Sequence, residues 1–582
     1  MATIPRPEHP NPQWERSSWR NLNGVWQFEI DHGVSGEARG LQNAPSLSGK
    51  IVVPFCPESR LSGVGNKDFM RCVWYKRIIS LAKKDLLGKR VILHIGACDF
   101  ETHVFVNGVE AGQPHFGGYG SFQYEITKFV KSGKNDITIE AIDDIQSLVQ
   151  PHGKQSAKYD SYRCYYTRTT GIWQTVWLEF VPESYITYAR YDTDVENGTV
   201  SIAADLAGVS DFSVEVYYNG KLMGKASKKK CAVRACVDIK LKEKHLWEIG
   251  KGRLYDLVLR FGDDEVKSYF GLRSVRMDGM KFLLNGKSVF QRLILDQGFY
   301  PDGICTAPSE EALIKDIDCG IAAGFEGARM HQKVFEPRYI YHADKKGYIV
   351  WGEYGSWGTD TSERSAVSYF LPDWISTVLR DVNHPSIVGW CPFNETWNTR
   401  EGKISKSQES EVLRIIYEET KRVDPTRPCI DTSGNYHVVT DIFDVHWYEQ
   451  DPDVFKAGYD KLWQTGELED RWSERQTYRG EPVFVSEYGG IGFKLENNDY
   501  TSGRKTQWSY GKSTGSYEEF YDRYKRLTHA IIDNPCMFGL CYTQLTDVEQ
   551  EQNGLFTYDT REPKFDLKIL KKIMKKIAAI EK

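Results

Sequence analysis

The sequence predicts a protein of several domains, with β-sandwiches followed by a (β/α)8 TIM barrel. Its 582 residues are too many for one ordinary core, because domains average about 150 residues. Up to about residue 272, short strands with turns between them are typical of sandwiches. From residue 273 onward, strands alternate with helical segments, which indicates a parallel barrel.

Two sandwich domains are expected before the barrel. In residues 1–180, alternating apolar and polar positions and the turn dipeptide Asn107-Gly108 favour a β-sandwich, which we expect to be a jelly roll of the galactose-binding type. Residues 181–272 have the size and the short strands of an immunoglobulin-like sandwich, with a turn at Asn219-Gly220. The strands predicted in the two domains are 24–30, 71–79, 90–95, 102–106, 136–141, 175–180, 199–203 and 212–218.

Residues 273–582 are predicted to form the barrel. After a hairpin at Asn285-Gly286, helical segments such as 309–317, which Ser309 can cap, separate the strands. The last helix, 566–580, carries one apolar face and one lysine-rich face, as an outer barrel helix does. The eight predicted strands are 289–297, 327–331, 348–353, 387–395, 429–433, 442–448, 483–488 and 537–546.

Composition argues against several classes of partner. A formal net charge of −5 does not suit nucleic acid as the main partner. No stretch reaches the roughly 18 apolar residues of a membrane span, and residues 1–10 do not form a signal peptide, so we expect a cytoplasmic protein. The 12 cysteines and 13 histidines show no metal-ligand spacing, and we expect neither a metal nor a cofactor.

Two glutamates follow buried-strand patterns and suggest the chemistry. Glu395 ends the fourth predicted strand and Glu487 ends the seventh, so both lie at the barrel mouth, on opposite sides. A single glutamate at such a position is as often a salt-bridge partner as a catalyst. Two carboxylic acids in one pocket, however, are the minimum for cleaving a glycosidic bond. The apolar run before Glu395 favours a protonated acid, whereas Glu487 is expected to stay ionised.

Several motifs along the chain resemble glycoside hydrolase family 2, which includes β-galactosidases, β-glucuronidases and β-mannosidases. They occur in the same order as in that family. The matching segments are Asn21-Leu-Asn-Gly-Val-Trp26, Gly117-Gly-Tyr119, Thr170-Gly-Ile-Trp-Gln-Thr-Val-Trp-Leu-Glu179, Phe270-Gly-Leu-Arg273, Leu284-Asn-Gly-Lys287, Asn383-His-Pro-Ser-Ile387, Asn394-Glu395 and Ser486-Glu487-Tyr-Gly489.

The resemblance implies a role for each glutamate. Glu395 corresponds to the acid/base and Glu487 to the nucleophile of a double displacement that retains anomeric configuration. Asn394 would bind the sugar 2-hydroxyl, and Tyr448 would lie beside the nucleophile. Arg329 also matches the family, and a gapless comparison puts Gln332, rather than His331, at the position of a family histidine. The remaining candidates for substrate contact are Asp296, Glu353, His446, Trp447 and Tyr542.

The sugar is less constrained than the reaction. β-Glucuronidases of this family read the substrate carboxylate with an Asn-x-Lys motif, but no lysine follows Asn553 at that spacing. We therefore expect a β-galactosidase acting on oligosaccharides or glycoconjugates, with α-L-arabinosidase, β-galactofuranosidase, β-glucuronidase and β-mannosidase as alternatives. Glu353-Tyr-Gly355 lacks the histidine of the magnesium site found in large β-galactosidases.

Two further readings remain open: a retaining endo-glycanase and a non-catalytic carbohydrate-binding protein. We expect a small-molecule or oligosaccharide glycoside as the substrate, with no nucleic-acid or membrane partner, and leave assembly into a homo-oligomer open. Whether the β domains lend a loop to the active site is left open, with Tyr159-Asp-Ser-Tyr162 as the candidate.

Overall fold

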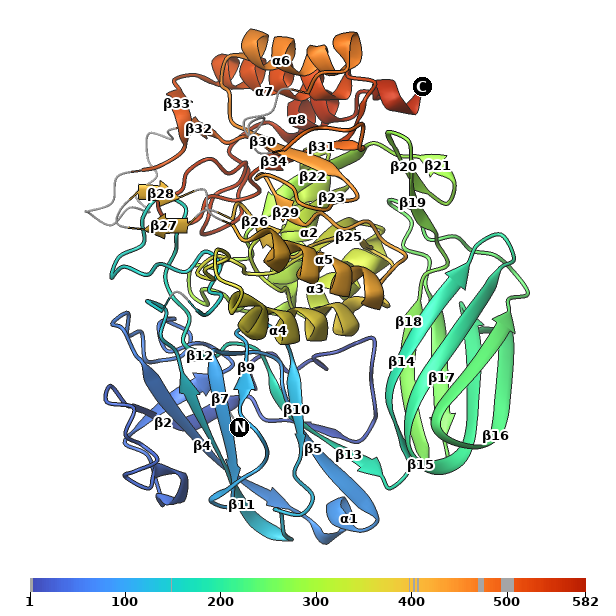
Figure 1. The fold of residues 1–582 in the computed structure, drawn as a ribbon. Coiled ribbons are helices and arrows are strands. Elements are labelled where there is room, and N and C mark those ends of the chain that lie inside the picture. The colour runs from blue at the N-terminus through green and yellow to red at the C-terminus, as the bar shows by residue number, and fades with distance from the viewer. Residues whose placement is uncertain are drawn as a thin grey trace.

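A computed structural model describes residues 4–147, 149–396, 398–400, 403–405, 408–468, 476–493 and 507–582. It contains a (β/α)8 barrel, with one sandwich beneath it and a sheet of long strands at its side (Figure 1). The buried apolar residues form a separate cluster in each of these three parts. No helix among the described residues is long and apolar enough to cross a membrane.

The sandwich is built from two antiparallel sheets that share one apolar core. That core includes Trp26, Val91 and Leu178, each at most 1% exposed. As predicted, Asn107-Gly108 forms a tight turn, with φ of 52° and 80°. One sheet has the order β1 (Trp19–Asn21), β13 (Val176–Pro182), β5 (Lys89–Ile95) and β10 (Phe122–Glu125). The other has the order β3 (Gly49–Val53), β2 (Gly24–Ile30), β4 (Cys72–Leu81), β11 (Gly133–Ile142), β7 (Glu101–Val106) and β8 (Val109–Glu110).

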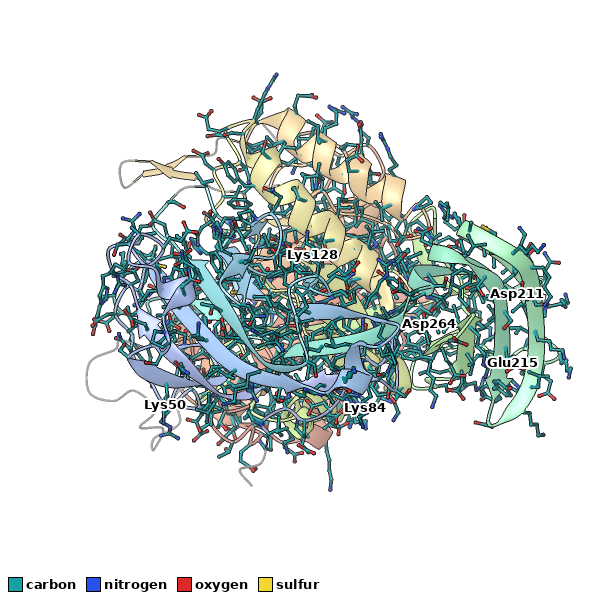
Figure 2. All side chains as sticks on the ribbon, turned by 90° about the horizontal axis from the view of Figure 1, so that it is seen from below. Lys50, Lys84, Lys128, Asp211, Glu215 and Asp264 are labelled. Carbon is teal, nitrogen blue, oxygen red and sulfur yellow. The ribbon has the colours of Figure 1, made fainter. Side chains whose placement is uncertain are left out.

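The lateral sheet is dominated by a long hairpin. Strands β15 (Thr199–Tyr218) and β16 (Lys221–Lys240) have 20 residues each and turn at Asn219-Gly220. Register shifts after Asp205 let the hairpin bend. One half of β15 therefore pairs with β14 (Tyr185–Asp194), and the other half pairs with β17 (Tyr255–Phe261). Strand β18 (Asp264–Phe270) pairs with β17 and ends the sheet. Figure 2 labels Asp211 and Glu215 on β15, and Asp264 where the sheet meets the sandwich, 2.8 Å from Arg16.

All eight predicted barrel strands are present. Seven form one sheet in the order β25-β24-β23-β22-β34-β31-β30, in which every neighbouring pair is parallel. The fifth strand, β29 (Thr432–Ser433), pairs with β26 (Phe393–Asn394), and a bridge from Trp390 to Cys429 continues this contact. The others are β22 (Gln291–Asp296), β23 (Gly327–Met330), β24 (Ile349–Glu353), β25 (Ile387–Cys391), β30 (Phe443–Trp447), β31 (Val483–Gly489) and β34 (Met537–Thr543).

Helices cover the outside of the barrel. They are α2 (Glu310–Ala323), α3 (Pro337–Lys346), α4 (Ala366–Asp381), α5 (Ser410–Val423), α6 (Pro452–Thr465), α7 (Tyr517–Ile532) and α8 (Leu567–Met574). The prediction of a final helix to residue 580 was wrong, because α8 ends at Met574. Arg292 explains the early end: its guanidinium donates to the carbonyls of Met574 and Lys576, the groups that a longer helix would use.

Candidate active site

The carboxylates of Glu395 and Glu487 meet at the carboxyl ends of the barrel strands. Glu487 lies within β31, and Glu395 follows β26. A carboxylate oxygen of Glu395 lies within 4.8 Å of a carboxylate oxygen of Glu487. Retaining glycosidases hold their two carboxyl groups about 5 to 5.5 Å apart, and inverting enzymes about 6.5 to 9.5 Å apart. The spacing here therefore suits a double displacement.

The backbone at Glu395 takes an uncommon conformation that directs its side chain. Its φ is +44°, in the left-handed region that residues other than glycine seldom adopt. The Glu395 amide donates to the carbonyl of Ser433, at 2.8 Å, which ties the loop to the end of β29. Glu395 is only partly buried, whereas Glu487 is 3% exposed. Glu395 thus has access to solvent that Glu487 lacks.

Polar side chains hold Glu487 in a fixed orientation. The Tyr448 hydroxyl donates to Oε2 of Glu487 at 2.5 Å and lies 3.0 Å from Oγ1 of Thr543. Arg329 donates to Oε1 of Glu487 at 3.3 Å. Each carboxylate oxygen therefore has a hydrogen-bond donor, which is what a charged nucleophile needs in a buried site.

His446 lies between the two glutamates. Its Nδ1 atom is 2.7 Å from Oε1 of Glu395 and 3.5 Å from Oε2 of Glu487. Burial alone would lower the pKa of His446, but Glu487, Glu395 and Asp444 raise it above its ordinary value. On the other side of the ring, Nε2 is 2.8 Å from Oγ of Ser433, which donates to Asp444. The two carboxylates therefore favour the protonated form of His446.

Arg329 connects the nucleophile to Asn394. Its guanidinium donates to Oε1 of Glu353 at 2.5 Å and to Oδ1 of Asn394 at 3.1 Å. Glu353, predicted to hold sugar hydroxyls or cap a loop, instead uses both oxygens on Arg329 and His331. The buried Nδ2 of Asn394 has no hydrogen-bond partner among the described residues. Asn394 can therefore donate to a substrate hydroxyl, as the sequence predicts.

Three predicted substrate contacts point away from the mouth. Trp447 packs on Phe455 of α6, with ring centroids 5.3 Å apart. Tyr542 packs on Tyr524 of α7 at 5.0 Å, and Asp296 accepts a hydrogen bond from Tyr339 of α3. Side chains alternate along a strand. Since His446, Tyr448 and Thr543 face the site, their chain neighbours Trp447 and Tyr542 face the outer helices. This geometry does not support the prediction that Trp447, Tyr542 and Asp296 contact the sugar.

The same alternation favours His331 over Gln332. His331 lies two residues after Arg329, and its Nε2 is 3.8 Å from Oε1 of Glu487. Gln332, the predicted contact, uses its amide on Oγ of Ser356 and on the backbone of Trp357. Residues two apart in a strand lie on the same face, so the sequence places His331 on the same face as Arg329. A gapless comparison with the family did not use this periodicity.

The segment between β11 and β12 (Gly171–Ile172) runs from the sandwich to the barrel mouth (Figure 1). The Tyr166 hydroxyl donates to Oε2 of Glu551 at 2.5 Å, and the Thr167 amide donates to Glu549 at 3.1 Å. The amide of Gln550 donates to the carbonyls of Arg163 and Tyr165. The candidate for such a loop was 159–162, and the contacts with the barrel involve residues on both sides of it, such as Gly153 and Tyr166.

Lys154, on the same segment, extends into the site. It is 4% exposed, and its ammonium lies 4.1 Å from the ring centroid of Trp357, whose indole NH donates to the Asn394 carbonyl. Burial alone would lower the pKa of Lys154, but Cys164, Glu551, Glu487 and Glu395 raise it. The sequence did not indicate this lysine, because only tertiary folding brings it near the glutamates.

Among the described residues, two groups of side chains have the spacing of metal ligands. Glu395, His446 and Glu487 form one, and Asp31, Cys72 and Glu140 in the sandwich form the other. A protonated His446 cannot ligate a metal, and its raised pKa favours that form. Burial raises the pKa of the Cys72 thiol, which favours its neutral form, and raises that of Glu140 to about 7, so this carboxyl group is only partly ionised near neutral pH. We therefore assign no metal to either group.

The barrel matches a known family. The family model described as glycosyl hydrolases family 2, TIM barrel domain, matches residues 338–579. A β-glucuronidase of Paenibacillus borealis is 22% identical over 95% of this chain and 96% of its own length. The β-galactosidase BoGH2A of Bacteroides ovatus is 24% identical over 75% of this chain and 54% of its own length.

Solved structures show the same fold. A β-glucuronidase from Ruminococcus gnavus, in complex with D-glucuronic acid, superposes with a TM-score of 0.79 at 18% identity, covering 98% of this chain and 100% of that chain. At this identity the likeness concerns the fold alone. It extends over the sandwich and the lateral sheet as well as the barrel.

Proposed function

We propose that this chain, whose barrel matches the model of glycoside hydrolase family 2, is a retaining exo-glycosidase that releases a β-linked hexuronic acid. One observation carries the reaction type: oxygens of Glu395 and Glu487 lie within 4.8 Å of each other at the barrel mouth. That the chain is a glycosidase rather than a non-catalytic carbohydrate-binding protein follows from the family.

In the first step, Glu487 attacks the anomeric carbon while Glu395 gives its proton to the leaving oxygen. The glycosidic bond breaks, a covalent glycosyl-enzyme forms, and the aglycone leaves as an alcohol. In the second step, Glu395 takes a proton from water, the resulting hydroxide attacks the anomeric carbon, and Glu487 leaves as a carboxylate. Two inversions give net retention.

The surrounding groups support these roles. His446 can donate a proton to Glu395 or hydrogen-bond to its carboxylate. His446 also contacts Glu487, so the protonation of the imidazole can change when Glu487 loses its negative charge on forming the glycosyl-enzyme. Tyr448 and Arg329 keep donors on Glu487 through both steps. Nδ2 of Asn394 is available for the 2-hydroxyl, whose hydrogen bond tightens at the transition state.

The sugar assignment departs from the expectation of a β-galactosidase. The β-glucuronidase names of relatives that cover nearly the whole chain favour an acidic sugar. β-Galactosidase stays a second candidate, because the Bacteroides ovatus relative carries that name and no lysine follows Asn553 at the required spacing.

A substrate panel tests the proposal. We would assay the wild type on 4-nitrophenyl β-D-glucuronide, β-D-galacturonide, β-D-glucoside, β-D-galactoside and β-D-mannoside, and identify the first-formed anomer by proton NMR. The expected result is fastest release from a uronide, with the β-anomer appearing first. An α-anomer would refute the double displacement. Preference for a neutral glycoside would refute the sugar assignment, and full activity of Glu487→Ala would refute the assignment of the nucleophile.

A further inference from the structure

We propose that Lys154, supplied by the first domain, determines the specificity of this site by binding the carboxylate at C5 of a hexuronic acid. The inference rests on the proposed function, because it concerns the sugar in the same site. It places the recognition of the acidic group on the sandwich rather than on the end of the barrel.

The ammonium of Lys154 has no charged partner among the described residues. The side chain is almost fully buried, yet it makes no ion pair within 4.0 Å and no hydrogen bond with any described residue. The ammonium makes a cation–π contact with the face of Trp357, which offsets part of the cost of burying a charge. Buried charges are normally paired. An anion that arrives with the substrate would supply the missing partner.

The charge around Lys154 explains why a cation is needed there. Glu395, Glu487 and Glu551 all act electrostatically on Lys154. A uronic acid brings a further carboxylate into this group, and like-charge repulsion would oppose its binding. A lysine that none of these glutamates neutralises directly gives the substrate carboxylate a favourable contact. A neutral hexoside has no group that would gain as much.

The barrel fixes the position of the lysine. The amides of His152 and Gly153 donate to the Trp357 carbonyl at 2.7 and 3.1 Å, and the Tyr166 amide donates to the Lys154 carbonyl at 2.7 Å. Trp357 is itself joined to Asn394 through its indole NH at 2.8 Å. The lysine backbone, the ring beneath its ammonium and the residue before Glu395 thus form one connected unit. Such preorganisation is expected of a specificity contact.

The decisive variant is Lys154→Met, which keeps an unbranched side chain only one atom shorter and removes its charge. A matched control is Lys158→Met, on the same segment, because Lys158 is exposed and its ammonium lies 4.2 Å from the ring centroid of Tyr162. We would measure kcat/KM on 4-nitrophenyl glucuronide and galacturonide, and on the matching neutral glucoside and galactoside. Inhibition by D-glucaro-1,5-lactone and by the neutral D-glucono-1,5-lactone would be measured in parallel.

For Lys154→Met we expect kcat/KM on the preferred uronide to fall roughly 10- to 100-fold, the range for loss of a charged hydrogen bond. The inhibition constant of the acidic lactone should rise by a similar factor, while values for the neutral glycosides and lactone change less than about threefold. Lys154→Arg should recover part of the loss. The two uronides show which sugar supplies the carboxylate.

Two outcomes would overturn the inference. If acidic and neutral ligands lose equally, Lys154 only supports the architecture of the site, and if the uronide is unaffected, Lys154 does not bind it. Thermal melting of each variant identifies a misfolded protein, in which case the ratio of lactone affinities in Lys154→Arg decides. A wild type that prefers neutral glycosides instead refutes the proposed sugar class, which distinguishes that failure from a failure of Lys154 alone.

Discussion

Nδ1 of His446 lies 2.7 Å from Oε1 of Glu395, so the proposed acid/base is hydrogen-bonded to a histidine on the sixth strand of the barrel. The same nitrogen is 3.5 Å from Glu487. A change of charge on either glutamate therefore alters the protonation of the imidazole that contacts the other glutamate. This arrangement makes the position and protonation of His446 a sensitive test of the proposed mechanism.

Gly434→Ala should displace His446 without removing a functional group. A Cβ at Gly434 would lie 2.1 Å from Nδ1 of His446, closer than real contacts allow, so the ring must move. We expect kcat/KM to fall at least about tenfold, with a loss of stability of about 1 to 3 kcal/mol. Gly466→Ala is the control, because Gly466 has a similar φ of +79° and open space around it. Equal activity of the two variants would contradict the prediction.

Glu395→Ala should show a loss that depends on the leaving group. Without a general acid, we expect kcat/KM to fall by about 10² to 10⁴ on substrates with a poorly acidic alcohol, and much less on 4-nitrophenyl substrates. Added azide should restore turnover by attacking the glycosyl-enzyme. Steady-state kinetics over a series of aglycones measures the effect, with the surface variant Glu411→Ala as control. The same loss on every aglycone would rule out Glu395 as the acid.

Tyr448→Phe should slow the reaction while leaving the fold intact. The phenol donates to Oε2 of Glu487 at 2.5 Å, and its loss removes one stabilising contact to the charge that forms when Glu487 departs. We expect kcat to fall about 10- to 100-fold, with a smaller change in KM. Tyr488→Phe, on the same strand as Glu487, removes a hydroxyl that lies 2.8 Å from Thr528 and should retain kcat. An unchanged kcat in Tyr448→Phe would show that the contact has no role in the chemistry.

His437→Gln should lose a pH-dependent part of the stability. Burial lowers the pKa of His437, but Asp431 and Asp444 outweigh this effect and raise it to about 10. Because the unfolded value is about 6.5, the stabilisation is fully present below that pH and is lost as pH rises toward 10.

Melting curves of the wild type and His437→Gln at pH 6, 8 and 10 measure the effect. The difference in Tm between the wild type and His437→Gln should be largest at pH 6 and should shrink toward pH 10. Each kcal/mol of unfolding free energy that the variant loses lowers Tm by about 2 to 4 °C. A gap that is constant across this range would contradict the raised pKa.

The sequence predicted the strands of the barrel well, because buried parallel strands are continuous apolar runs and Asn-Gly pairs mark the hairpins. It also predicted the meeting of Glu395 and Glu487, since strand ends at one mouth converge. It was less accurate for the side chains around them. Whether Trp447 or Tyr448 faces the site depends on the pleat at the end of the strand, and a register shift between Val445 and His446 alters it there.

Lys154 illustrates a different limit. No periodicity or motif connects a lysine in a loop of the first domain to glutamates that lie more than 200 residues later in the chain. Its place in the site follows from backbone contacts with the Trp357 loop. Such contacts depend on how two domains dock, which local sequence patterns do not report.

The hydrogen bond from Tyr166 to Glu551 joins the segment before β12 to the loop after the last barrel strand. Cutting the chain between the lateral sheet and the barrel would remove this donor from the buried carboxylate of Glu551. The working unit of this enzyme therefore includes the sandwich as well as the barrel. Changes in sugar preference can arise in the sandwich, where they leave the residues that break the glycosidic bond untouched.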